Sequence, residues 1–138
     1  MKSFVNSFDF SAINFSELAE YDPAVYKRKL LYSDDFIDIF LIGWAQKQGS
    51  KIHDHPENGC LMRVLNNELC EETYVKNQEK LEKLSFKRLV QGETGHIKKC
   101  TVLHRIFNES EEKSLSLHVY SPPNYKTKYY DDAGKLLE

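Results

Sequence analysis

Two histidines separated by one residue, His53 and His55, are the first feature of this chain that could do chemistry. If residues 49–55 are extended, side chains alternate between the two faces of the strand, so both imidazoles share one face. His104, inside another apolar and β-branched run, is the best candidate for a third donor, and His118 is its rival. Three neutral imidazoles on strands would hold a first-row transition metal and leave coordination positions open for substrates. An isolated pair of this kind also occurs in ordinary hydrogen-bonded polar networks, so the neighbouring residues must decide.

A second group of polar side chains lies near the end of the chain. Ser116, His118 and Tyr120 alternate with Leu117 and Val119, so an extended strand would place the three polar groups on one face. If that face is turned inward, the strand borders a polar cavity. If it is turned outward, the three side chains are simply solvated.

The order of these residues resembles the two metal motifs of the cupin barrel. Cys60 follows the histidine pair where many cupins carry a glutamate ligand, and Asn108 follows His104 by four residues. The pattern Ile-His-Asp-His, then Cys60, then Leu-His-Arg-Ile, then Ser-Leu-His-Val-Tyr-Ser-Pro-Pro is similar to cysteine dioxygenase, a cupin thiol dioxygenase. The similar part covers residues 26–123.

The resemblance implies an all-β fold, a small cupin barrel (double-stranded β-helix or jelly roll) with a short N-terminal helical segment. It implies an Fe²⁺ cofactor held by a set of three histidines: His53, His55 and His104. It also implies substrate-binding roles for Arg28, which would face a carboxylate, and for Tyr26 and Tyr120.

The same resemblance assigns roles beside the metal. Ser116, His118 and Tyr120 would form a hydrogen-bonded relay that ends at the tyrosine hydroxyl. Cys60 would lie next to the site, and some members of the family join the corresponding cysteine and tyrosine by a thioether bond, here Cys60 to Tyr120. The Ser121-Pro122-Pro123 segment would contain a cis peptide bond, as in the family.

The implied reaction adds both atoms of O2 to the sulfur of L-cysteine and yields cysteine sulfinic acid. The nearest alternative is a dioxygenase of 3-mercaptopropionate or another small thiol, against which Arg28 argues because relatives that prefer that acid usually lack this arginine. A different class is a non-catalytic cupin that binds a metal or a small ligand. A zinc hydrolase is a third class, for which Glu57, expected in a loop, is the one carboxylate placed as a possible general base.

The chain is expected to form one cupin domain over residues 1–138, with an N-terminal segment at about 1–23, a barrel at about 24–123 and a short polar tail at 124–138. Asn14 and Glu17 predict the start of one short helix against the barrel. The Asn66-Asn67 pair predicts a hairpin turn, and residues 76–84 a loop or helical turn. The tail stops before further strands of longer family members, so a different sheet edge is expected.

Composition limits the function classes. With 41% hydrophobic residues, 29% charged residues and a net charge of −2, the chain has neither a basic surface for nucleic acid nor a membrane segment, and small molecules are its expected partners. Three cysteines without a secretory signal predict free thiols and a cytoplasmic location. The chain is expected to be a monomer. Cys70 and Cys100 are expected to be small buried hydrophobic residues.

Overall fold

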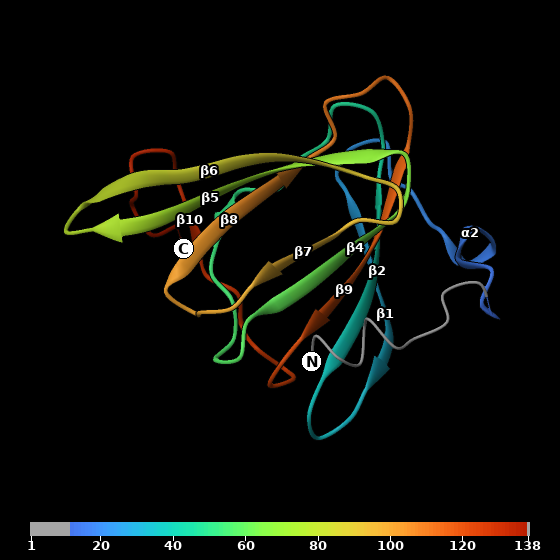
Figure 1. Ribbon diagram of the computed structural model, residues 1–138, viewed down its shortest axis with the longest axis horizontal. Helices are drawn as coiled ribbons and strands as arrows, with labels where there is room; N and C mark the ends of the chain where they lie inside the picture. The colour runs from blue at the N-terminus through green and yellow to red at the C-terminus, as the bar shows by residue number, and fades with distance from the viewer. Residues whose placement is uncertain (1–11, 138) are drawn as a thin grey trace.

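The computed structural model describes residues 12–137 and contains two five-stranded antiparallel sheets that face each other (Figure 1). The first sheet, in spatial order, consists of β1 (Lys27–Ser33), β2 (Asp38–Trp44), β9 (Ser114–Tyr120), β4 (Cys60–Asn66) and β7 (Thr94–Ile97). The second consists of β10 (Tyr129–Tyr130), β3 (Ile52–His53), β8 (Val102–Phe107), β5 (Glu68–Asn77) and β6 (Lys80–Val90). The expected all-β fold is therefore confirmed.

The main hydrophobic core lies between the two sheets. It takes alternate side chains from β2 and β4 on one side and from β5, β6 and β8 on the other, because successive residues of a strand point to opposite faces. Its buried members are Ile42, Trp44, Met62, Val64, Leu69, Leu89 and Ile106. The sheets are thus held face to face by apolar contacts at one end, which leaves the remaining interior for polar groups.

A short helix, α2 (Phe15–Leu18), covers the outer face of the first sheet. Phe15 is 7% exposed and packs with three leucines of that face: Leu41, Leu115 and Leu117. The predicted short helix against the barrel is confirmed, but it is one turn long and Asn14 makes no side-chain capping hydrogen bond. Residues 1–11 of the predicted N-terminal segment lie outside the described residues.

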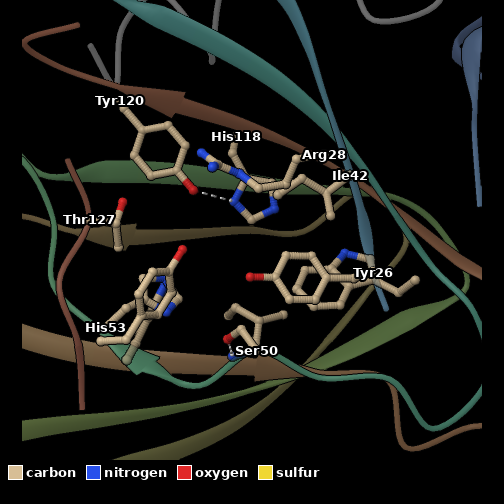
Figure 2. A pocket seen from close by; sticks show the side chains of 12 residues that line it. Tyr26, Arg28, Ile42, Ser50, His53, His118, Tyr120 and Thr127 are labelled. Carbon is tan, nitrogen blue, oxygen red and sulfur yellow. Dashed lines mark hydrogen bonds between the residues drawn. The ribbon is translucent and has the colours of Figure 1, made fainter. Parts of the chain in front are cut away.

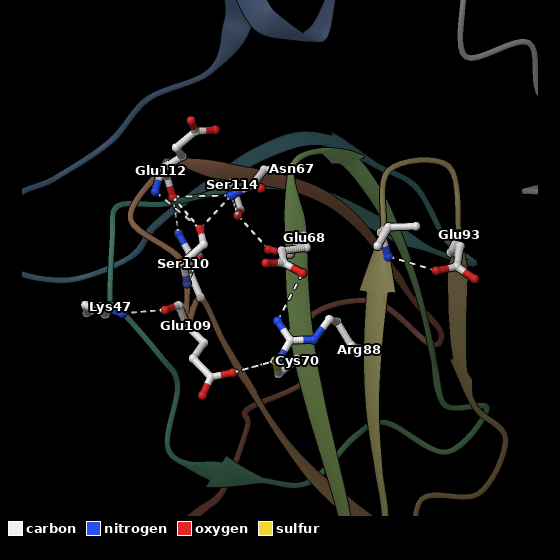
Figure 3. Close-up of polar contacts among 12 residues, drawn as sticks. Lys47, Asn67, Glu68, Cys70, Arg88, Glu93, Glu109, Ser110, Glu112 and Ser114 are labelled. Carbon is white, nitrogen blue, oxygen red and sulfur yellow. Dashed lines mark hydrogen bonds and ion pairs between the residues drawn. The ribbon is translucent and has the colours of Figure 1, made fainter.

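The turn at Asn67 does not close a hairpin. Asn67 has the expected positive φ of 61°, yet β4 belongs to the first sheet and β5 to the second, so the chain crosses between sheets here. Its side-chain amide donates hydrogen bonds to Ser110 Oγ (2.7 Å) and Ser114 Oγ (2.9 Å), which fix the crossing (Figure 3). The hairpin prediction was wrong because turn geometry does not specify whether the flanking strands pair; each strand instead buries its apolar face against the opposite sheet.

Residues 76–84 also differ from expectation, since they form no helical turn. They include the end of β5, a turn in which Gln78 has a φ of 59°, and the start of β6. The two strands pair from Glu68 opposite Val90 to Asn77 opposite Lys80, and most side chains near the turn are exposed, as predicted. The sequence does not alternate between apolar and polar residues here, because neither face of this end of the hairpin is buried.

The C-terminal tail contributes a strand. Tyr129 pairs with His53 and Tyr130 with Ile52, so β10 extends the edge of the second sheet beside β3. The Ser121–Pro122 peptide bond before it is cis. The tail, expected to lie beyond the barrel, is therefore part of the sheet that carries His53.

The three cysteines are free thiols, as expected. Cys60 and Cys70 are buried, whereas Cys100 is exposed in the turn before β8, contrary to its prediction as a buried residue. Among residues 12–137, no helix is long and apolar enough to cross a bilayer.

Replacing Gly59 should destabilise the fold more than replacing another glycine of similar conformation. Gly59 has a φ of +87°, and an added Cβ would lie 1.8 Å from the Ile97 carbonyl oxygen of β7. Gly92 has a φ of +92° with open space around it. Gly59→Ala should therefore lower the free energy of unfolding by about 3 kcal/mol or more, from strain and clash together.

Gly92→Ala is the matched control and should cost about 1 kcal/mol, from the backbone conformation alone. Urea denaturation followed by circular dichroism measures both values. Equal losses in the two variants would mean that the contact between Gly59 and β7 does not constrain this turn.

Candidate metal centre

Three histidines meet between the two sheets. His53 on β3 lies directly opposite His104 on β8, and His55 follows His53 by two residues, just beyond the end of β3. All three are buried, and one ring nitrogen from each lies within 4.8 Å of the other two. The structure thus brings together the three histidines predicted as ligands, although regular strand pairing covers only Ile52–His53 of the expected extended segment.

Each imidazole is oriented by a hydrogen bond at its Nδ1 atom. His53 Nδ1 lies 2.8 Å from the Lys51 carbonyl oxygen, and His55 Nδ1 lies 3.1 Å from the Val102 carbonyl oxygen. His104 Nδ1 lies 2.8 Å from Glu71 Oε2. The two carbonyl partners can only accept, so Nδ1 of His53 and of His55 carries the proton. With Glu71 ionised, His104 Nδ1 also carries the proton, and each Nε2 then presents a lone pair.

The arrangement of the Nε2 atoms fits a bound cation. The Nε2 atoms of His53 and His104 are 3.0 Å apart, and His55 Nε2 is buried without a hydrogen-bond partner among the described residues. Lone pairs that converge at this distance repel one another unless a positive charge lies between them. Imidazole Nε2 with a carbonyl or carboxylate behind Nδ1 is the usual geometry of a histidine metal ligand, so the residues present fit a divalent transition metal.

Burial keeps this donor set neutral. The pKa of His53 is lowered by burial, and the pKa values of His55 and His104 are lowered further by burial and by the neighbouring imidazoles. Burial raises the pKa of Glu71. Protons therefore compete weakly for the Nε2 atoms at neutral pH, which favours metal binding.

A chain of hydrogen bonds runs along the inward face of β9. Trp44 Nε1 donates to Ser116 Oγ (2.9 Å), Ser116 Oγ lies 2.7 Å from His118 Nε2, and the Tyr120 hydroxyl lies 3.4 Å from His118 Nδ1. Burial, followed by the charge of Arg28, lowers the pKa of His118 to about 3, so this imidazole is neutral. One consistent assignment has Ser116, which accepts from Trp44, donating to His118 Nε2, and His118 Nδ1 donating to the Tyr120 oxygen.

In that assignment the Tyr120 hydroxyl proton is not used within the chain of hydrogen bonds, and the neighbouring Cys60 sulfur is a hydrogen-bond partner of this hydroxyl. Burial raises the pKa of Tyr120 well above its usual value, so the hydroxyl stays protonated. His118 is engaged by Ser116 and Tyr120, and the convergent group of three ligand nitrogens contains His104 in its place. His118, the alternative third ligand, therefore lies beside the histidine cluster as part of the chain that orients Tyr120.

A pocket of about 340 Å³, its solvent-open part included, connects the histidines with this chain (Figure 2). Residues of both sheets line it, including His53 and His104 on one side and His118 and Tyr120 on the other. In Figure 2 the hydroxyls of Tyr26 and Tyr120 both point toward its interior. None of its 12 lining residues, all within the described part of the chain, is an aspartate or a glutamate.

Arg28 and Tyr26 line the same pocket, as their spacing of two on one strand face predicted. The Arg28 guanidinium lies 4.1 Å from the centre of the Phe40 ring and 6.0 Å from that of Tyr120. No carboxylate among residues 12–137 forms an ion pair with it. Tyr26 stacks on Trp44 with ring centres 4.7 Å apart, and burial, then the neighbouring Tyr129, raises its pKa to about 12.

Cys60 is 1% exposed and pairs with Tyr120 across β4 and β9. Residues directly opposite on neighbouring antiparallel strands point to the same face, so both side chains are directed inward. Burial raises the pKa of the Cys60 thiol, which is therefore protonated. The thiol and the phenol are thus adjacent at the edge of the pocket.

Sequence patterns missed several residues of this site. Glu71 is one of them, because an acidic residue within a buried strand does not by itself indicate which histidine it will meet. Trp44 is another, because its indole N–H meets Ser116 only through the pairing of β2 with β9. Thr127 and Tyr129 line the pocket from the segment taken as a polar tail, and only the Tyr129-Tyr130 pair hinted at a strand there.

Two other residues named in the sequence lie elsewhere. Asn108 is buried, and its side-chain amide donates to the carbonyl oxygens of Trp44, Ala45 and Glu112, so it organises a loop. Glu57 is exposed in the turn after the histidine pair and does not line the pocket. A hydrolytic site with Glu57 as base therefore has no support in this arrangement.

Comparison with known proteins gives a family match over nearly the whole chain. The family model for cysteine dioxygenase type I matches residues 1–133. Cysteine dioxygenase type 1 of Bos taurus is 27% identical over 128 residues, which cover 89% of this chain and 64% of that protein. The Danio rerio protein of the same name is 26% identical over 137 residues, 95% of this chain and 68% of its own. The chain thus spans about two-thirds of the length of these relatives.

The fold has solved counterparts. A Klebsiella pneumoniae protein described as having a double-stranded β-helix domain superposes with a TM-score of 0.67 at 17% identity, covering 91% of this chain and 96% of that one. At this identity the likeness concerns the fold alone. The predicted double-stranded β-helix of the cupin type is confirmed.

Removing the charge of Glu71 should weaken metal binding without unfolding the site. Glu71→Gln retains the shape of the side chain but replaces the carboxylate that orients His104 with a neutral amide. We expect the affinity for a divalent metal to fall about 10- to 100-fold, measured by titration of the metal-free protein with iron(II) or cobalt(II).

Glu57→Gln provides the control, because it removes the same charge from an exposed turn close to the histidine pair in sequence. It should leave the affinity unchanged. A normal affinity in Glu71→Gln would show that the contact with His104 is dispensable for the metal.

Proposed function

The chain belongs to the cysteine dioxygenase type I family, and from this membership and the site we propose that it is an iron(II)-dependent thiol dioxygenase. Its proposed reaction adds both atoms of O2 to the sulfur of L-cysteine and yields cysteine sulfinic acid. The observation that carries the proposal is a pocket without a carboxylate in its lining that joins a neutral three-histidine cluster, which fits a divalent metal, to the positively charged Arg28.

Arg28 supplies recognition of the substrate carboxylate. Its planar guanidinium can donate two parallel hydrogen bonds to a carboxylate, and no acidic residue of the described chain already occupies it. Phe40 lies against one face of the group and restricts its movement. The nearby Tyr26 hydroxyl offers a further hydrogen bond to the same end of the ligand. These contacts favour a small thiol with a carboxylate over one without.

The three histidines form the end of the pocket that would bind the substrate sulfur. His53, His55 and His104 would hold iron(II) through their Nε2 atoms, with Glu71 and two carbonyl groups fixing the rings. When bound, the metal would bring the substrate sulfur and O2 together and favour the thiolate form of the sulfur. Neutral imidazoles leave the full charge of the ion available for an anionic soft ligand.

Tyr120 supplies a hydrogen-bond donor between the two ends. When its oxygen accepts from His118, its own proton can be donated to the substrate or to oxygen in the pocket. Ser116 and Trp44 keep His118 in the tautomer that this requires. The relay therefore orients one proton without carrying charge, since the pKa values of His118 and Tyr120 keep both groups neutral.

We further propose that Cys60 and Tyr120 can be joined covalently. Their positions opposite one another on β4 and β9 support a bond between Cys60 Sγ and a ring carbon of Tyr120. Formation of the bond removes one hydrogen from the thiol and one from the ring, and O2 accepts the two electrons and two protons. The free-thiol state of all three cysteines is in keeping with a cytoplasmic location, which we propose together with a monomeric state.

Oxygen uptake tests the reaction. Iron(II)-loaded protein should consume O2 with L-cysteine and form the sulfinate, with lower kcat/KM for 3-mercaptopropionate, which lacks the amine, and for cysteamine, which lacks the carboxylate. Higher activity with 3-mercaptopropionate would reassign the substrate. No uptake with any thiol by protein that holds iron would point instead to a cupin that binds a metal or small ligand without catalysis.

Arg28→Ala refines that test. It should lower kcat/KM for L-cysteine about 10- to 100-fold through loss of the charge-assisted hydrogen bonds, and change the value for cysteamine and the iron content little. Lys27→Ala, which removes a positive charge from an exposed position on the same strand, should have little effect on either thiol. Equal losses of cysteine and metal binding in Arg28→Ala would indicate a structural role.

Mass spectrometry tests the covalent bond. After turnover with iron and cysteine, the peptides that contain Cys60 and Tyr120 should be recovered joined, at a mass two hydrogens below their sum. Cys60→Ser should abolish the joined species, and Cys70→Ser should leave it unchanged. Separate peptides of unaltered mass from protein that has turned over would contradict the bond.

A further inference from the structure

The segment of residues 124–130, here called the C-terminal strap, runs across the metal segment and contributes two side chains to the pocket. Thr127 and Tyr129 line it, and in Figure 2 Thr127 lies on the side away from Tyr26. Nothing in the role assigned to the histidines or Arg28 accounts for these two residues. The strap therefore forms one wall of the pocket, and the role of this wall needs its own explanation.

Asp54, the residue between the two metal-site histidines, anchors the strap. Its side chain points away from the imidazoles that flank it and is 9% exposed. Tyr125 donates its hydroxyl proton to Asp54 Oδ2 (2.6 Å), and the Lys128 amide donates to Asp54 Oδ1 (2.8 Å). The Asp54 amide in turn donates to the Lys128 carbonyl oxygen (3.1 Å). The His-Asp-His segment thus faces the metal site on one side and holds the strap on the other.

This anchoring fixes Tyr129 against the metal site. Tyr129 pairs with His53 across β10 and β3, and the centres of their rings are 5.8 Å apart. On the opposite face of the strap, Tyr130 lies under the ammonium group of Lys76, 5.5 Å from its ring centre. One tyrosine of the pair therefore borders the pocket, while its neighbour is directed away.

We propose that Tyr129 determines the size of the thiol that the pocket accepts. The inference rests on the proposed function for the substrate class: the sulfur lies at the histidine cluster and the carboxylate at Arg28. Those two fixed positions limit the span of the ligand, and a longer chain between them must bulge sideways. The rings of Tyr26 and Tyr129 bound that space, and Tyr26 is held in place by Trp44. A ligand with one more methylene would have to displace Tyr129, which the anchored strap opposes.

Trp44 provides a readout that does not depend on catalysis. It is the single tryptophan of the chain, lines the pocket and stacks on Tyr26, so its fluorescence should respond when a ligand enters. Iron(II)-loaded protein without oxygen can be titrated with L-cysteine and with L-homocysteine, which is one methylene longer. The ratio of the two dissociation constants measures size selection.

Three variants distinguish the effect of the Tyr129 ring from a general effect of altering the strap. Tyr129→Ala should shift the dissociation-constant ratio about tenfold or more in favour of L-homocysteine, the effect typical of one methylene in a fitted pocket. Tyr129→Phe keeps the ring and should retain the selectivity of the unaltered chain. Tyr130→Ala makes the same truncation on the opposite face and should also retain it. An unchanged ratio in Tyr129→Ala, or an equal shift in Tyr130→Ala, would overturn the inference.

Loosening the anchor should have a smaller effect in the same direction. Tyr125→Phe removes one hydrogen bond to Asp54 without touching the pocket lining, and hydrogen exchange of the strap amides should become faster while β4 is unaffected. The experiments can refute the proposed size limit and the proposed reaction independently of each other. Selective thiol binding without O2 uptake would refute the reaction alone, and O2 uptake with an unchanged ratio in Tyr129→Ala would refute the size limit alone.

Discussion

The structure depends on three buried imidazoles that must all stay neutral and present the same nitrogen to one point. Each therefore needs a hydrogen-bond acceptor behind its Nδ1 atom. Two of these acceptors are backbone carbonyl groups and the third is Glu71, so the site exists only in one register of the strands. With His53 opposite His104, the lone pairs converge; a slip of one residue would turn one ring to the other face of the sheet.

A polar interior at the metal site has consequences for the opposite sheet. On β9 the serine, histidine and tyrosine occupy the inward face, so its leucines must point outward, where water would otherwise meet them. Leu115 and Leu117 are instead covered by Phe15 of α2. The short N-terminal helix thus stabilises a strand whose polar side chains face the interior and whose leucines face outward. Apolar contacts on the outer face of the sheet offset those that are missing inside.

Local patterns predicted the parts of this site that follow from strand alternation. His53 and His55 share a face, and so do Ser116, His118 and Tyr120 on β9. Both predictions needed only the alternation of side chains along an extended strand. Partners fixed by strand pairing were not predictable, because the sequence does not specify which strands are neighbours. Glu71 meets His104 through pairing of β5 with β8, and the turn at Asn67 could not reveal that its strands enter different sheets.

Charge connects the two ends of the pocket. A cage of neutral histidines would leave both positive charges on a divalent ion, and Arg28 adds a further positive charge, while burial keeps His118 neutral. The described lining has no carboxylate to offset them. Positive charge at both ends of the pocket would favour a ligand negative at both ends over one negative at a single end, through electrostatic complementarity. A thiolate and a carboxylate in one small molecule meet that requirement, and the distance between them is what Tyr129 would restrict.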